Sequence, residues 1–297
     1  MKQFTGFKGR TGLALIYTII VLLALICLLP LWNIVAISFS SNQAVTANAV
    51  GLWPVDFTTA PYQKIMADTQ FWRSFGLSVL RVGLTLVLNM FVIILMAYPL
   101  SKSKKQFKGR NFYMNLLIFA MLFNGGMIPT YLVVKNLDLL NTVWALVLPA
   151  AVPIFSIILV MNFFAGVPKA LEEAAVIDGA NQFTVLLRIF IPVSLPSLAT
   201  VALFSIVGSW NDFFNGLIYM TKVSEYPLMT YIQTLSVDIA DIIKSGGNAQ
   251  DLANATEVSN RNLNAAKIVV AVIPLLLIYP ALQKYFITGI VVGSVKE

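Results

Sequence analysis

Long apolar runs separated by shorter polar connections make up most of this chain. A helix that crosses a membrane needs about 20 mostly apolar residues. Six runs meet this requirement, so the pattern predicts an all-α membrane protein with six transmembrane helices. The predicted spans cover residues 13–39, 75–100, 112–134, 142–164, 198–220 and 267–285.

The first run follows Lys2, Lys8 and Arg10, an arrangement that a secretory signal peptide shares. The run is longer than the apolar part of a signal peptide, and no small-residue cleavage site follows it cleanly. We therefore expect it to stay in the membrane as an anchor.

Prolines interrupt several predicted spans, and two interpretations of them stay open. A proline frees backbone groups that neighbouring helices or water must satisfy, which suits a bundle around a cavity. Proline is also more frequent in membrane helices than in soluble ones. The prolines concerned are Pro30, Pro99, Pro129, Pro149, Pro153 and Pro274.

The composition agrees with a membrane protein. Of the 297 residues, 58% are hydrophobic and 11% are charged, whereas a soluble domain has about 25% charged residues. The net charge of +7 could attract nucleic acid. The basic residues, however, lie in short clusters between apolar runs, where cytoplasmic loops carry them. We expect membrane lipid, and no nucleic acid, among the partners.

The basic clusters predict the orientation in the membrane, because cytoplasmic loops are enriched in Lys and Arg. Residues 1–12 carry three basic residues and no acid. The connection 40–74 is longer but has only two basic residues, balanced by two acids. We therefore expect both termini and the connection 165–197 in the cytoplasm, and the segment 221–266 outside. The connection 101–111 supports this with Lys102, Lys104, Lys105, Lys108 and Arg110.

The chain has no histidine and one cysteine, Cys27, inside the first apolar run. Disulfides, zinc sites built on Cys and His, and catalysis by His are therefore excluded. We expect Cys27 to be a small buried apolar residue. The adjacent Glu172 and Glu173 point in different directions on a helix, and no span holds paired carboxylates. The pattern indicates no catalytic residue, no metal site and no membrane-embedded enzyme.

The cytoplasmic connection between the fourth and fifth spans contains a short amphipathic segment. Pro168 suits the first turn of a helix, and Glu172 and Glu173 lie favourably near its positive end. Ala174 and Ala175 keep one face thin, so that another surface can approach closely.

Gly179 permits a left-handed turn that ends this helix, and a second short helix is expected to run to Pro192. The residues alone leave two interpretations open. The segment is either a compact helix–turn–helix projection on the cytoplasmic face or an ordinary loop that covers the mouth of a pore.

The amino-acid sequence of the segment favours the first interpretation. Glu173-Ala-Ala, Gly179 and Ile189-x-Ile191-Pro192, spaced by three and nine residues, resemble the EAA signature of importer permeases of the ATP-binding-cassette superfamily. Isoleucine stands at position 191 where leucine is usual. The resemblance implies that the segment is the coupling element that docks on a cytoplasmic ATPase. The residues implied in coupling are Glu172, Glu173, Ala174, Ala175, Asp178, Gly179 and Ala180.

Further segments resemble the carbohydrate-uptake branch of this family. They cover residues 125–137, 140–146 and 209–215, and the tail 283–296 resembles complex-oligosaccharide members. Many relatives have a proline near position 216, where this chain has Gly216. The resemblance implies the type I importer permease fold, with a cytoplasmic coupling helix, in the inner membrane of a bacterial cell. It divides the chain into an N-terminal region, 1–74, a transmembrane domain, 75–288, and a cytoplasmic tail, 289–297.

The resemblance also implies the partners. They are a second homologous permease, two ATPase subunits, an extracytoplasmic solute-binding protein and an oligosaccharide substrate. No GxxxxGK[ST] phosphate loop occurs in the sequence, so ATP and Mg are expected on the separate ATPase. No cofactor is expected on this chain.

Polar residues in the third and fifth spans are candidates for the sugar path. A polar group at membrane depth is costly and usually faces a cavity or a partner. Asn211 and Asn215 would share one helical face, which favours the cavity. For Trp210 and Tyr219, packing between helices is the favoured alternative. The candidates are Asn124, Tyr131, Trp210, Asn211, Asp212 and Asn215.

Three other features complete the prediction. Arg81 in the second span is expected to extend its long side chain to the outer interface. The outer segment is expected to reach the binding protein, with flexible filler as the alternative; its polar residues are Asp238, Asp241, Lys244, Gly246, Gly247 and Asn248. A stand-alone secondary transporter would need an internal repeat and a relay of buried acids, and Asp212 is the only acid in any predicted span.

Overall fold

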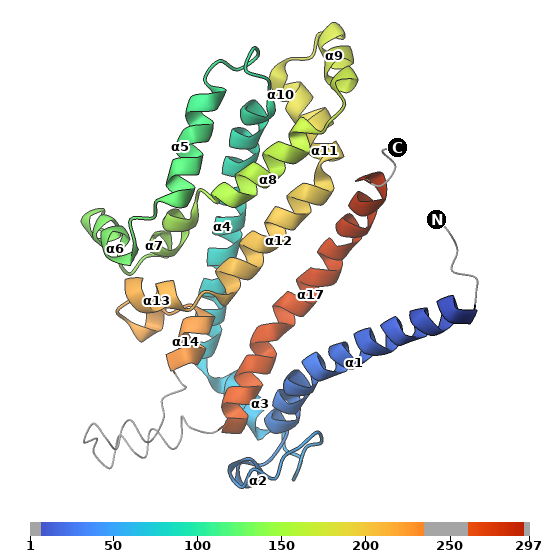
Figure 1. Ribbon diagram of the computed structural model, residues 1–297. Helices are drawn as coiled ribbons and strands as arrows, with labels where there is room; N and C mark the ends of the chain where they lie inside the picture. Colours follow the sequence, from blue (N-terminus) through green and yellow to red (C-terminus); the bar gives the residue numbers. More distant parts are fainter. Residues whose placement is uncertain (1–6, 235–260, 294–297) are drawn as a thin grey trace. The chain divides into compact units, whose positions relative to one another are not determined.

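The computed structural model describes residues 7–234 and 261–293, and no strand occurs among them (Figure 1). Contacts divide the chain into two parts. The N-terminal part holds residues 1–69 and 234–272, and the main part holds residues 70–233 and 273–297. The domain boundaries predicted after residues 74 and 288 stay predictions.

The N-terminal part contains α1 (Phe7–Ser38), α2 (Asn42–Thr46), α3 (Ala60–Ala67) and the start of α17 (Arg261–Gly293). The stretch Gly12–Ser38 is apolar all round, and no residue of its most apolar window is buried within the chain. Cys27 is therefore exposed on this helix. The expectation that it is buried was wrong, because none of the residues that the structure describes covers α1 at that point.

Polar contacts fix the connection that follows α1. The side chains of Trp32 and Asn33 donate to the carbonyl oxygens of Leu52 and Gly51 at 2.7 and 2.6 Å. The start of α17 is tied to the same part, because Lys267 pairs with Asp68 at 2.7 Å.

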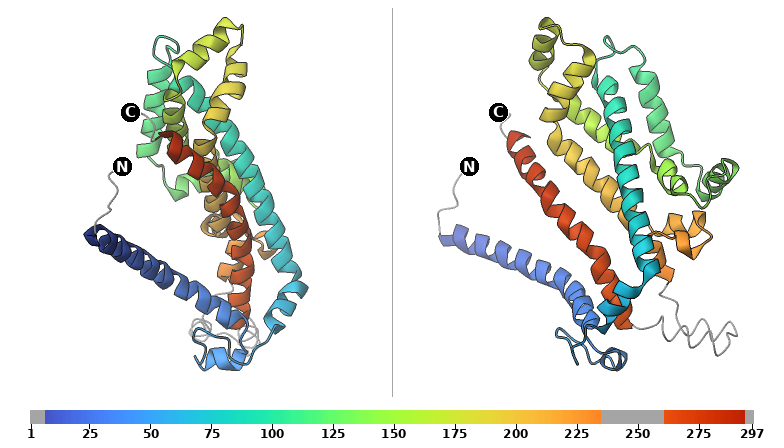
Figure 2. Two further views of the ribbon diagram at one scale, coloured as in Figure 1. Left: turned by 90° about the vertical axis from the view of Figure 1, so that its right-hand side faces the viewer. Right: turned by 180° about the vertical axis from the view of Figure 1, so that it is seen from behind.

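The main part is a bundle of longer helices joined by short ones (Figure 2). The loop after α4 and the helices α9 and α10 lie at one end of this part, and α6, α13 and α14 lie at the other (Figure 1). Its helices are α4 (Thr69–Ser101), α5 (Arg110–Leu122), α6 (Met127–Asn136), α7 (Val143–Val147), α8 (Ile154–Ala165), α9 (Lys169–Ile177), α10 (Gln182–Val185), α11 (Ile191–Val193), α12 (Leu195–Asn211), α13 (Phe214–Tyr219) and α14 (Leu228–Thr234).

The described residues contain three helices long and apolar enough to cross a membrane, or six spans if each bent helix pair counts as one. This agrees with the six predicted spans. The continuous helices are Gly12–Ser38, Thr69–Ser101 and Arg261–Ala281. The bent pairs are Arg110–Leu122 with Met127–Asn136 at 111°, Val143–Ala150 with Ile154–Ala165 at 47°, and Gln182–Val193 with Leu195–Asn211 at 81°.

The third predicted span is not one continuous helix. Phe123 leaves the helical region at φ −109° and ψ 98°, and Gly126 adopts φ +88°, which a residue with a side chain rarely does. The side chain of Asn124 accepts a hydrogen bond from the Gly126 amide at 2.8 Å. The span predicted over 112–134 therefore consists of two helices, because this turn ends α5.

The fifth predicted span also ends early. Helix α12 stops at Asn211, and Asp212 is extended, with ψ 103°. The Asp212 carboxylate accepts from the amide of Asn215 at 3.1 Å, and such a side-chain bond competes with helical backbone bonds. The prediction of one helix over 198–220 was wrong for this reason.

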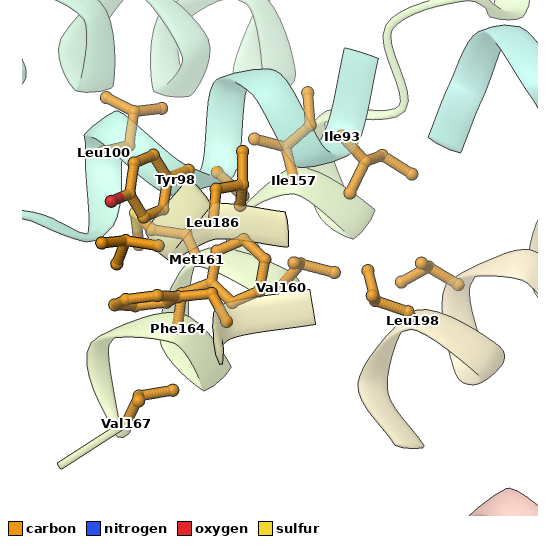
Figure 3. Packing of buried hydrophobic residues seen from close by; sticks show 14 of the residues in the cluster. Ile93, Tyr98, Leu100, Ile157, Val160, Met161, Phe164, Val167, Leu186 and Leu198 are labelled. Carbon is orange, nitrogen blue, oxygen red and sulfur yellow. The ribbon is translucent and has the colours of Figure 1, made fainter. Parts of the chain in front are cut away.

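One apolar core joins α4, α8, the segment 185–190 and α12 (Figure 3). Three rings from three elements meet in it: Tyr98, Phe164 and Phe190 lie with centroids 5.0 to 6.4 Å apart, in edge-on arrangements. Such aromatic contacts stabilise a core beyond the area that they bury. This core positions the end of the bundle from which α9 projects.

Candidate functional site

Helix α9 and helix α10 form a short projection, here called the coupling knob, over residues 168–185. Pro168 occupies the cap position before α9, with ψ 125°, rather than the first helical turn. Helix α9 ends at Ile177, and Gly179, two residues later, has a φ of +82°, which is left-handed as predicted. The amides of Gly179 and Ala180 donate back to the carbonyls of Val176 and Ala175 at 3.0 and 2.9 Å. This pair of bonds is the Schellman termination that glycine favours.

The second helix of the knob has its own cap. The Asn181 side-chain oxygen accepts from the Thr184 amide at 2.8 Å, which satisfies a free donor at the start of α10. The helix continues through a π-helical turn, Leu186–Phe190, into α11. The sequence analysis did not identify this capping role of Asn181.

The knob exposes apolar side chains that this chain leaves uncovered. Ile177 is 86% exposed and Phe183 is 68% exposed. Leu171, Val176 and Leu187 are exposed beside them. Neighbouring exposed apolar side chains of this kind are characteristic of a protein-binding surface. Of the predicted coupling residues, the exposed ones are Glu173, Ala174, Asp178 and Gly179.

The structure separates the two adjacent glutamates. Glu173 is exposed, whereas Glu172 forms an ion pair with Lys102 at 2.8 Å. Ala175 and Ala180 are half-buried and pack against the core of the main part. The predicted coupling set therefore contains a face that is free to bind and a face that holds the knob to the chain.

An open concavity of about 1010 Å³ lies between the loop after α4 and helix α9. Basic residues of that loop and acidic residues of α9 both line it, among them Lys102, Lys104, Lys105, Arg110, Glu172 and Glu173. The knob and this loop form one continuous end of the main part (Figure 1).

The residues predicted for the sugar path lie in two groups. In the first, Asp212 forms an ion pair with Arg81 and accepts a hydrogen bond from the Asn215 side chain at 2.7 Å. Trp210 is 4% exposed and packs edge-on against Phe75, with centroids 5.7 Å apart.

Asn211 is exposed, whereas Asn215 is half-buried. Because α12 ends at Asn211, the two asparagines do not share a helical face, and that expectation was wrong. Arg81 is 3% exposed and bonded to Asp212. The expectation that it reaches the outer interface was also wrong, because the carboxylate lies within the bundle.

The second group comprises Asn124 and Tyr131. Asn124 is exposed and holds the turn before α6. Tyr131 of α6 stacks on Tyr219 of α13, with ring planes 5° apart, in a small core with Val134 and Met220. This contact fixes α6 against α13.

The sequence analysis did not identify a stripe of buried polar residues along α4. Its members follow one another at intervals of three or four residues, which places them on one helical face. Ser78 accepts from the Leu228 amide at 2.8 Å, and the Asn89 side chain donates to Ser205 at 3.2 Å. The spacing alone could have revealed the stripe, whose members are Ser74, Ser78, Arg81, Thr85 and Asn89.

Within the described residues, no cluster of three or more His, Cys, Asp or Glu side chains could hold a metal ion. The predicted contact of the outer segment with a binding protein falls on Asp238, Asp241, Lys244, Gly246, Gly247 and Asn248, all of which lie outside the described residues.

Comparison with known proteins relates the chain to one family. The family model described as "Binding-protein-dependent transport system inner membrane component" matches residues 90–292. Protein LplC of Bacillus subtilis (strain 168) is 41% identical over 271 residues, which cover 91% of this chain and 90% of that protein.

Two further relatives cover almost the whole chain. The polygalacturonan/rhamnogalacturonan transport system permease protein YtcP of Bacillus subtilis (strain 168) is 38% identical, over 97% of this chain and 99% of that protein. A chain in the crystal structure of a bacterial ABC transporter involved in the import of the acidic polysaccharide alginate matches with a TM-score of 0.83 and 31% identity. That match covers 96% of this chain and 100% of the other.

Proposed function

Because this chain belongs to the family of binding-protein-dependent transport system inner membrane components, we propose that it works as one of two permease subunits in an ATP-driven importer. The importer receives an oligosaccharide from a solute-binding protein and releases it into the cytoplasm. The family and the importer permease fold confirm the resemblance found in the sequence.

The observation that carries the proposal is the coupling knob. Its capped helices present uncovered apolar side chains, Ile177 and Phe183 above all, beside the exposed Glu173 and Ala174. A compact projection with an apolar face fits a groove on another protein. We assign that groove to an ATPase subunit. That subunit binds ATP and Mg, because this sequence contains no phosphate loop.

The proposed assembly contains this chain, a second homologous permease, two ATPase subunits and the solute-binding protein. An oligosaccharide is the substrate that the relatives support, since one is named for polygalacturonan and rhamnogalacturonan and another for alginate. The membrane is the inner membrane of a bacterial cell.

The proposed orientation places both termini and the coupling knob in the cytoplasm. The five basic residues between positions 101 and 111 support it, because cytoplasmic loops are enriched in Lys and Arg. Labelling tests it: Lys104→Cys in a Cys27→Ser background should resist an impermeant maleimide added outside intact cells. Lys104 is exposed on the chain, so rapid labelling from outside would reverse the assignment.

Uptake by membrane vesicles tests the function itself. Vesicles that contain the complete importer should accumulate the oligosaccharide only with ATP inside and loaded binding protein outside. Uptake driven by an ion gradient without ATP would instead support a secondary transporter and contradict the proposal.

A further inference from the structure

Lys102, the first residue after α4, lies between a carboxylate and two aromatic rings. Its Nζ atom is 2.8 Å from Glu172 Oε1 and 4.2 Å from the ring centroids of both Tyr98 and Phe190. A cation over an aromatic face is attracted by the ring, more strongly where water is excluded. The side chains of Lys102 and Glu172 are 10% and 16% exposed, so the cluster is largely shielded from water.

This cluster joins three elements that are far apart in the sequence. Tyr98 belongs to α4, Glu172 to α9, and Phe190 ends the π-helical turn before α11. The hydroxyl of Tyr98 also donates to the Gln182 side chain at 2.7 Å. One end of α4 therefore holds both helices of the coupling knob, and Tyr98 itself is set in the apolar core (Figure 3).

Helix α9 has little other attachment. None of its residues is buried, and Ala175 packs only partly against the core. An element with few buried contacts moves more readily than the core to which it is attached. The ion pair between Lys102 and Glu172, in contrast, is close and largely shielded from water, where the attraction between opposite charges is stronger than in bulk water. The contact between Lys102 and Glu172 is thus placed to transmit a displacement of α9 to α4.

We propose that Lys102 is a positioning residue of energy coupling, which ties α9 to α4 through Glu172 and the two rings. When a bound ATPase displaces α9, the end of α4 follows, and the transmembrane bundle responds. The inference rests on the proposed docking of the coupling knob on an ATPase. It gives Glu172 and Glu173 different tasks, since Glu172 faces Lys102 and Glu173 faces the partner.

The test uses the complete importer in proteoliposomes and measures sugar delivered per ATP hydrolysed, together with the amount of ATPase that co-purifies. Lys102→Met keeps the apolar stem and removes the charge. Glu172→Gln removes the charge from the other side. Lys102→Arg keeps a cation that can stack on the rings and bind the carboxylate. Lys108→Met is the matched control, because Lys108 is an exposed lysine of the same loop that does not line the concavity.

Lys102→Met and Glu172→Gln should each lower the sugar delivered per ATP by about fivefold, a coupling effect of ordinary size, with ATPase binding unchanged. The double variant should lose no more than either single one, because both break the same contact. Lys102→Arg and Lys108→Met should match the wild type.

A normal ratio of sugar to ATP in Lys102→Met would overturn the inference while the proposed function stands. A loss of assembled complex with a normal ratio of sugar to ATP would also overturn the inference, since it would show that Lys102 has a purely structural role. If the wild-type importer itself bound no ATPase or took up no sugar with ATP, the proposed function would fail instead.

Discussion

Arg81 of α4 and Asp212 at the end of α12 form an ion pair inside the main part, 131 residues apart in the sequence. The Arg81 guanidinium also donates to the backbone carbonyl of Asp212 at 3.0 Å. The side chain of Arg81 therefore pairs with the Asp212 carboxylate and also hydrogen-bonds to the backbone carbonyl of the same residue, at the point where α12 ends. The pair fixes the geometry of the break that carries Asn211 and Asn215.

Breaking this pair from one side should destabilise the protein strongly. Arg81→Leu leaves the carboxylate of Asp212, whose side chain is 20% exposed, without its partner, at a cost of about 3–5 kcal/mol. Thermal unfolding of the purified protein in detergent should show a clearly lowered midpoint. Arg73→Leu, an exposed position on the same helix, should leave the midpoint nearly unchanged.

The double variant Arg81→Leu with Asp212→Asn provides the internal control. It removes both charges, so it should unfold at a higher temperature than Arg81→Leu alone. If Arg81→Leu were as stable as the wild type, the ion pair would contribute nothing to stability and this prediction would be wrong.

Gly216 of α13 should not accept even a methyl group. A Cβ atom there would lie 2.0 Å from Oγ1 of Thr230, whose hydroxyl donates to the Phe213 carbonyl at 2.8 Å. Gly216→Ala should therefore push α14 away and cost about 1–3 kcal/mol. Gly208→Ala is the control, since a Cβ at position 208 meets nothing within 4 Å. Equal unfolding midpoints for the two variants would refute this packing argument.

The two asparagines near the break should differ in phenotype. Asn211 is exposed, whereas the Asn215 side chain donates to Asp212. Asn211→Leu should impair uptake with little effect on unfolding. Asn215→Leu should lower the unfolding midpoint, because it removes a hydrogen bond to a charged group worth about 1.5–3 kcal/mol. Unchanged uptake kinetics in Asn211→Leu would remove this residue from the proposed sugar path.

The spans were predictable because a long apolar run can be recognised as a membrane span without knowledge of the tertiary structure. The second span was expected over 75–100, and the helix covers Thr69–Ser101. The breaks were not predictable in the same way. The turn at Gly126 depends on a single left-handed residue, and the end of α12 depends on a carboxylate whose partner Arg81 lies on another helix.

The coupling knob was predictable in part. Gly179 was expected in a left-handed turn, and its φ of +82° confirms this. The turn was predictable because the end of a helix is decided by local chemistry. The different environments of Glu172 and Glu173 were not predictable. They arise from Lys102, which lies 70 positions earlier in the chain and meets Glu172 only after the bundle has folded.

The coupling surface should be sensitive to backbone strain as well as to bulk. Gly179→Val places a β-branched residue at φ +82°, which costs about 1–2 kcal/mol or more and distorts the turn. Binding of the ATPase should weaken. Gly179→Asn is the control, because asparagine tolerates the left-handed region; similar behaviour of the two variants would show that the turn geometry is unimportant.

The most direct test of the account is co-purification of the ATPase subunit with Ala174→Trp. Ala174 is exposed on the coupling knob, so an indole there adds bulk to the docking face without disturbing the transmembrane helices. The variant should insert in the membrane and pair with the second permease, yet retain little ATPase and show no uptake. Full retention of the ATPase with normal uptake would mean that the knob is only a connector, which would contradict the central claim.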